Sequence, residues 1–197
     1  MPLVLTVDQR SSSDGPDRVP AMLERLAPVA ALRGFRRTAG DEFQGILDDP
    51  DSLPGALEPL LREGNWWVGI GVGDLVTPLP VHANEGRGAA YLRAREAVTA
   101  AKQAVRPVRV AGPEPAVAEQ LESAIWLWAA LLDRRTDKGW EVADLLDEGL
   151  SHERVAQRLG ITQSAVSQRA RAAGVVEGGR ARALVAHLAA ACLEHTA

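Results

Sequence analysis

The segment from residue 151 to residue 173 constrains the fold of this 197-residue chain more than any other feature of its sequence. Its apolar residues recur at helical spacing in two short runs: Val155, Ala156, Leu159, Ile161, Val166 and Ala170. Gly160 lies between the runs, where a tight turn needs the left-handed backbone that glycine adopts without strain. Thr162 is placed to cap the second helix. The sequence therefore predicts two short helices that pack through their apolar faces and join at Gly160.

This pattern resembles the bacterial helix-turn-helix family at the positions that the family restricts, which are Ala156, Gly160, Ile161 and Val166. The resemblance implies that the second helix enters the DNA major groove. Gln and Ser side chains pair with base edges, and Arg binds guanine or phosphate. The predicted DNA contacts are Thr162, Gln163, Ser164, Ser167, Gln168, Arg169 and Arg171. The alternative is a helical hairpin that packs against a partner domain.

The charge of this segment suits DNA although the formal net charge of the chain is -4. Between Arg154 and Arg182 there are six arginines and one acid, Glu177, so the local charge is six minus one, or +5. Phosphate contacts act within about 10 Å at moderate salt, so this local charge matters more than the net charge. Four acids lie just upstream, and we expect them to face away from phosphate: Glu141, Asp144, Asp147 and Glu148.

Residues 1–112 alternate between strand-like and helix-like segments. Single strands are predicted over 2–8, 65–73 and 105–112. A hairpin is predicted over 35–47, with Gly40 in its turn. Helices are predicted over 18–31, 53–62 and 87–105. The order βαββαβ followed by αβ predicts a ferredoxin-like α+β domain. Its helices are expected on one face of an antiparallel sheet.

A proline- and glycine-containing stretch, GPEPA at 112–116, is predicted to end this first domain. A connecting helix is expected over 113–135, and an all-helical DNA-binding domain over 136–197. The final helix repeats Leu184, Leu188 and Cys192 at four-residue spacing, which is typical of a core stripe or of a dimer seam.

Three acidic residues form a candidate metal site in the first domain. Asp8 ends the first predicted strand, and Asp41 and Glu42 follow Gly40 in the hairpin. Because the first strand lies beside the hairpin in a ferredoxin-like sheet, these carboxylates are expected at one sheet edge. Such oxygen ligands suit Mg²⁺ and a nucleotide phosphate.

Several stretches resemble nucleotide-handling proteins. TVD at 6–8, RTAGDEF at 37–43 and WWVGIGVG at 66–73 look like the palm domain of nucleotidyl cyclases and GGDEF diguanylate cyclases. The chain resembles the SatD family more closely, through WWVGIGVG and four further stretches: TVDQRSSS at 6–13, AGDEFQ at 39–44, GRGAAYLRAREA at 86–97 and TQSAVSQR at 162–169. That resemblance implies a cyclase-like N-terminal unit followed by a helix-turn-helix.

The chain departs from active cyclases at several positions. Ala39 replaces the first glycine of the GGDEF pattern, which narrows the space for a purine. Leu92 and Glu96 stand, in one alignment, where class III cyclases have Asn and Arg, and Lys102 is the only lysine of the first domain. We therefore expect no cyclase activity, and three roles stay open for this domain: sensing of a metal or nucleotide, dimerisation, and a purely structural part.

The remaining sequence features favour a cytoplasmic protein. Cys192 is the only cysteine, the N-terminus lacks a signal-peptide pattern, and no run approaches the roughly 20 apolar residues of a membrane span. The predicted function is a DNA-binding transcriptional regulator that acts as a homodimer, because one short helix makes few contacts. No cofactor is required. The alternatives are a DNA-tethered domain that processes nucleotides with Mg²⁺, and a pure interaction module.

Overall fold

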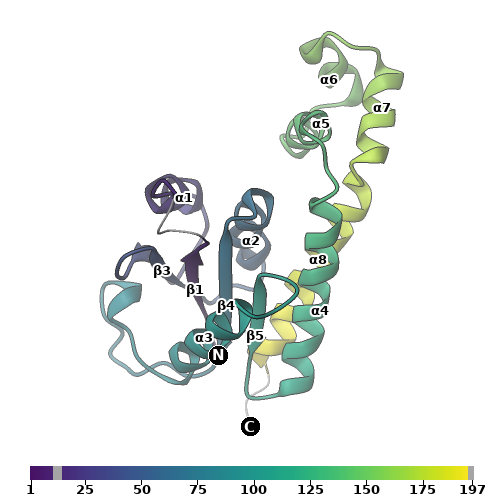
Figure 1. Cartoon of the computed structure of the whole chain (residues 1–197). Helices are drawn as coiled ribbons and strands as arrows, with labels where there is room; N and C mark the ends of the chain where they lie inside the picture. The colour runs from purple at the N-terminus through teal and green to yellow at the C-terminus, as the bar shows by residue number, and fades with distance from the viewer. Residues whose placement is uncertain (11–14, 195–197) are drawn as a thin grey trace. The chain divides into compact units, whose positions relative to one another are not determined.

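The computed structural model describes residues 1–10 and 15–194 and has an α+β fold. The chain divides into two compact units (Figure 1). Unit 1 comprises Met1–Trp126 and the part of the last helix that begins at Ala183, and unit 2 is Leu127–Arg182. The predicted linker at 112–116 is therefore not where these units divide. The division falls inside two long helices instead.

Unit 1 contains a five-stranded sheet in the order β2-β3-β1-β4-β5. The strands are β1 (Leu3–Gln9), β2 (Arg33–Arg37), β3 (Glu42–Leu47), β4 (Trp66–Val72) and β5 (Val108–Ala111). The first four pair antiparallel in the ferredoxin-like order that the sequence predicts. The predicted last strand, β5, pairs parallel with β4, so the sheet is mixed and not purely antiparallel.

Helices cover both faces of this sheet, and the expectation of helices on one face is wrong. The helices are α1 (Val19–Leu26), α2 (Ser52–Glu63) and α3 (Ala89–Ala101), with a short 3₁₀ turn η1 (Ala83–Glu85) before α3. Figure 1 shows α1 and α2 on one side of the strands and α3 on the other. The face toward α1 and α2 is mainly apolar, with Gln9 as a buried polar residue. Its aromatic rings Phe43 and Trp66 meet edge-on at 5.4 Å.

Two glycines of β4 explain why α3 packs on the second face. A Cβ at Gly69 would lie 2.2 Å from the carbonyl oxygen of Ala94, and one at Gly71 would lie 2.0 Å from that of Ala90. No larger residue fits between the strand and the helix backbone. The alternating glycines of WWVGIGVG therefore encode a close helix-to-sheet contact.

Five helices make up the rest of the chain: α4 (Pro115–Leu132), α5 (Asp137–Asp147), α6 (His152–Leu159), α7 (Gln163–Ala172) and α8 (Val175–Glu194). The inward stripe of α8 within unit 1 is Val185, Ala189 and Cys192, whereas Leu184 is 47% exposed. As a core stripe, the prediction is correct at Cys192 and wrong at Leu184, and the alternative of a dimer seam stays a prediction. Among the described residues, no helix is long and apolar enough to cross a membrane.

Candidate functional site

The two helices predicted over 151–173 are present as α6 and α7, and side-chain caps set where each begins. Ser151 accepts a hydrogen bond from the Arg154 amide at 3.3 Å, and Thr162 accepts one from the Ala165 amide at 3.1 Å. Gly160 ends α6 with φ 64° and ψ 34°, the left-handed conformation expected of it. The turn between the helices is therefore fixed by local sequence.

A small apolar core holds α5, α6 and α7 together. Its buried members are Val142, Leu145, Val155, Ala156, Val166 and Ala170. Leu159 and Ile161 pack against it and are partly buried. The residues that the sequence predicts to face inward therefore do so. Ala156 remains 7% exposed and Val166 is fully buried.

The outward face of α7 is polar and open to solvent. Six of the seven predicted DNA contacts are exposed: Thr162, Gln163, Ser164, Ser167, Gln168 and Arg171. Arg169 differs, because its side chain is only 28% exposed and its guanidinium lies 4.0 Å from the Glu141 carboxylate of α5. Ser167 also has a partner, since its hydroxyl oxygen lies 3.2 Å from Nδ1 of His152 on α6. Nothing in the linear pattern indicates this last contact.

The acids upstream of the motif neutralise part of the arginine cluster. Besides the Glu141–Arg169 contact, Asp147 on α5 pairs with Arg182 at 3.0 Å. Two of the six arginines are therefore already paired. The other four are exposed and form no ion pair within the described part of the chain: Arg154, Arg158, Arg171 and Arg180. These four are the cations free to meet phosphate.

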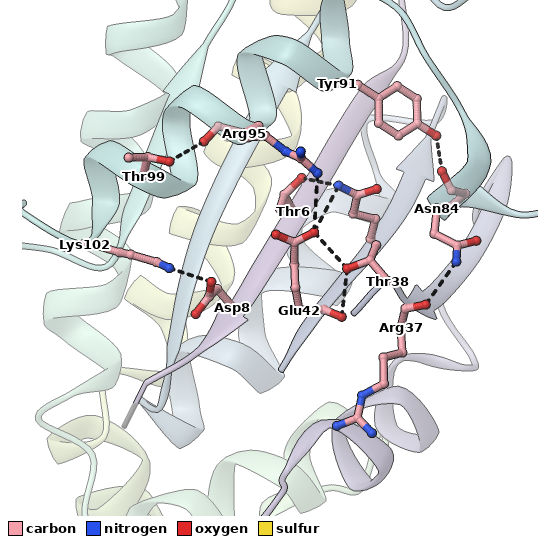
Figure 2. Close-up of polar contacts among 12 residues, drawn as sticks. Thr6, Asp8, Arg37, Thr38, Glu42, Asn84, Tyr91, Arg95, Thr99 and Lys102 are labelled. Carbon is pink, nitrogen blue, oxygen red and sulfur yellow. Dashed lines mark hydrogen bonds and ion pairs between the residues drawn. The ribbon is translucent and has the colours of Figure 1, made fainter. Parts of the chain in front are cut away.

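In unit 1, the predicted carboxylates divide into a pair and a separate residue. Asp8 of β1 and Glu42 of β3 are cross-strand partners on the face that α3 covers. Like charges directly opposite each other destabilise a sheet, so this pair needs compensation. Lys102 Nζ donates to Asp8 Oδ2 at 2.6 Å, and Arg95 lies 3.9 Å from Glu42 Oε1 (Figure 2). Each carboxylate thus has a cation from α3 or its C-terminal cap.

Hydroxyl and amide groups complete the surroundings of Glu42. Thr38 Oγ1 donates to Glu42 Oε1 at 2.8 Å, and Gln44 Nε2 lies 3.5 Å from the same oxygen. Gln44 Nε2 also donates to Thr6 Oγ1 at 3.1 Å. The Glu42 carboxylate therefore belongs to a polar network on the sheet (Figure 2).

Asp41 does not join this network. It lies in the hairpin turn, where its backbone oxygen accepts a hydrogen bond from the Gln9 amide at 3.2 Å. Within residues 1–10 and 15–194, no three His, Cys, Asp or Glu side chains are close enough together to hold a metal ion. The structure thus brings two of the three predicted ligands together.

Sequence reasoning missed the basic residues that face these carboxylates. Arg95 and Lys102 stand two helical turns apart and so share a face of α3, which is a readable signal. The contact of that face with Asp8 and Glu42 can be inferred only once α3 is known to pack beside β1 and β3. The sequence alone does not reveal this tertiary contact between α3 and the sheet.

Comparisons with known proteins identify no family. No protein-family model matches the chain, and no curated protein matches it. Among solved structures, the chain is similar to the crystal structure of a regulator of polyketide synthase expression from Bifidobacterium adolescentis, with a TM-score of 0.27 and 16% identity. The similarity covers 96% of this chain and 84% of that one. A TM-score this low supports no conclusion about fold or function.

Proposed function

We propose that the protein is a DNA-binding transcriptional regulator in which α7 contacts base edges in the major groove. The observation that supports this most is the pairing of a buried α5–α6–α7 core with a polar, exposed outer face on α7. A helix-turn-helix needs both features, because the core fixes the recognition helix and the outer face meets the bases. The four unpaired arginines add the charge that phosphate contacts require.

The roles of the individual residues follow from their chemistry. Gln163, Ser164 and Gln168 can donate to and accept from bases, and Arg171 can bind guanine or phosphate. Arg169 is a positioning residue, because its contact with Glu141 ties α7 to α5. We assign the weakest direct part in DNA binding to Arg169 among the predicted contacts.

A homodimer is part of this proposal. One recognition helix gives few base contacts, and two helices on half-sites about 34–36 Å apart supply the usual affinity and read a palindrome. Sedimentation with and without DNA tests it. Two protein chains on each bound duplex are expected, and one chain per duplex at saturation contradicts it.

The proposal is tested by selecting bound sequences from a random DNA pool with the full chain. Enrichment of a two-fold symmetric site is expected. The selected site is then used to compare variants, with Arg25→Ala as a charge-matched control, because Arg25 lies on α1 and pairs with Glu63 at 3.4 Å. Recovery of no enriched sequence at low salt would count against DNA recognition and favour an interaction module.

A second candidate is a Mg²⁺-dependent nucleotide site on unit 1. The cross-strand register of Asp8 and Glu42 favours it, since the register supplies two oxygen donors on one face. Both carboxylates already have cationic neighbours, so a metal ion must displace Lys102 and Arg95. Calorimetric titration of Mg²⁺ with a nucleoside triphosphate tests this candidate. Heat that Asp8→Asn removes supports it, and no heat from the wild type contradicts it.

We also propose that the chain belongs to the SatD family. Its support is the placement of its two specific stretches. GDEFQ at 40–44 forms the hairpin turn and the start of β3, and TQSAVSQR at 162–169 forms the cap and first turns of α7.

A further inference from the structure

An open pocket of about 540 Å³ lies in unit 1, at the N-terminal end of α3. Its volume is in the range of sites that hold small organic ligands. Its walls come from β3, from the η1 turn and from the first turns of α3. The lining residues are Gln44, Asn84, Gly86, Arg87, Gly88, Ala89, Tyr91, Leu92 and Arg95.

The wall of this pocket is built by two glycines that cannot be replaced without strain. A Cβ at Gly86 would lie 2.1 Å from the Tyr91 hydroxyl oxygen. Gly88 has φ 137°, and a Cβ there would lie 2.4 Å from the carbonyl oxygen of Asp74. The Tyr91 hydroxyl donates to the Ala83 carbonyl, and burial raises the pKa of Tyr91, so this bond persists at neutral pH (Figure 2). The loop before α3 is therefore packed closely against Tyr91 and tied to it by this hydrogen bond.

The lining is cationic. Arg87 and Arg95 contribute two positive charges, and no residue that lines the pocket is acidic. Glu42 lies near Arg95, but at 3.9 Å the pair is long, and the Arg95 side chain is 69% exposed. Arg95 therefore keeps most of its hydrogen-bonding capacity for a ligand.

Backbone donors add to this charge. Gly88 caps α3, and in the described structure the amides of Arg87, Gly88 and Ala89 donate to no acceptor. Amides at the start of a helix attract anions, because their N–H groups and the helix dipole both favour negative charge. The two arginines and the residues of these free amides all line the pocket.

Gln44 reaches the pocket from the sheet and supplies a hydrogen-bond acceptor there. It is a polar side chain with only 4% of its surface exposed. Its amide nitrogen is used by Thr6 and Glu42, while its carbonyl oxygen accepts no hydrogen bond within the described part of the chain. This oxygen is not one of the fully buried atoms that lack a partner, so it is open to the pocket, where a donor on a bound molecule can pair with it.

We propose that this pocket binds a phosphate monoester of nucleotide size. The phosphate is held by Arg87, Arg95 and the amides of residues 87–89, and a donor on the rest of the ligand pairs with Gln44. Leu92, which is 68% exposed, offers apolar area beside the pocket. This site uses neither Asp8 nor Asp41, needs no metal ion, and does not depend on whether unit 2 binds DNA.

Calorimetric titration of the full chain with AMP, GMP, CMP and UMP, in a phosphate-free buffer with EDTA, tests the proposal. At least one monophosphate is expected to bind more tightly than inorganic phosphate and than its own nucleoside. Arg87→Gln and Arg95→Gln should each weaken that binding at least tenfold, because each removes a charge-assisted contact. Arg25→Gln, a matched loss of charge on α1, should leave it unchanged.

Amide NMR spectra provide a readout that does not depend on folding of the variants. Addition of the bound monophosphate to wild-type protein is expected to shift the amide signals of residues 87–89 and the Gln44 side-chain signal. Absence of binding by all four monophosphates overturns the proposal. The proposal is also overturned if neither arginine substitution weakens binding, or if binding shifts none of these signals.

Discussion

At the residue scale, glycine at positions 69 and 71 determines how unit 1 packs. Each lacks the Cβ that would otherwise strike the backbone of α3 at about 2 Å. Backbone atoms cannot rotate away as side chains can, so a methyl group there forces the whole helix to move. Gly160 and Thr162 act at the same scale in unit 2, where they end one helix and begin the next.

Substitution of Gly71 by Ala should destabilise the protein. The added methyl overpacks a full interface, which typically costs roughly 1 to 3 kcal/mol of unfolding free energy. Urea denaturation followed by circular dichroism measures the change. Gly55→Ala is the control, because Gly55 is exposed within α2 with nothing within 4 Å of an added Cβ. There the same change should stabilise by up to about 1 kcal/mol, and equal effects at the two positions would contradict the packing account.

The Cys192 thiol should make stability fall at high pH. Burial raises its pKa from 9.0 to about 11. Between these two pKa values the folded protein retains a proton that the unfolded chain has lost. The stability that depends on the protonated thiol is therefore fully present below pH 9 and is lost as the pH rises from 9 to about 11. The loss is of the order of 2 kcal/mol. Cys192→Ala should reduce the decline in unfolding free energy over this range, and an identical decline in both proteins would refute the assignment.

At the element scale, the proposed mode of DNA binding gives α6 and α7 different roles. In a helix-turn-helix the first helix crosses the phosphate backbone while the second reads bases. Here α6 contains two exposed, unpaired arginines, Arg154 and Arg158, and the outer face of α7 is rich in Gln and Ser. Arg169 instead contacts α5, so the six arginines of this region are not equivalent.

Replacement of Arg158 by Ala should weaken binding to specific and random DNA alike. Loss of one phosphate contact should reduce the slope of log affinity against log salt by about 0.9. Fluorescence anisotropy over a salt series measures this slope. Arg169→Ala is the internal comparison, since its ion pair predicts a smaller change, and a larger change for Arg169 than for Arg158 would be incompatible with this division.

At the scale of the whole molecule, what the sequence predicts correctly is what local chemistry determines. The helices α6 and α7 and the turn between them followed from residues within a 23-residue window, because caps, a turn glycine and apolar spacing all act over a few residues. The ferredoxin-like order followed from the alternation of strands and helices. The face occupied by α3 did not, since it depends on contacts between β4 and a helix some 20 residues away.

The candidate site on unit 1 shows the same limit. Asp8 and Glu42 could be predicted as neighbours, because the hairpin lies beside the first strand in this fold. Their cations, Lys102 and Arg95, belong to a helix more than 40 residues further along the chain. The division of the chain inside α4 and α8 was also missed, because helical periodicity continues unbroken through both helices.

The central claim is that the outer face of α7 reads DNA sequence. Its most direct test is the affinity of wild-type protein, Gln168→Ala and Arg171→Ala for the selected site and for a scrambled duplex, measured by anisotropy at one salt concentration. Each substitution should weaken the free energy of binding to the selected site by roughly 1 to 3 kcal/mol. The variants should therefore discriminate less than the wild type between the selected site and the scrambled duplex. Wild-type affinity and discrimination in both variants would contradict the claim.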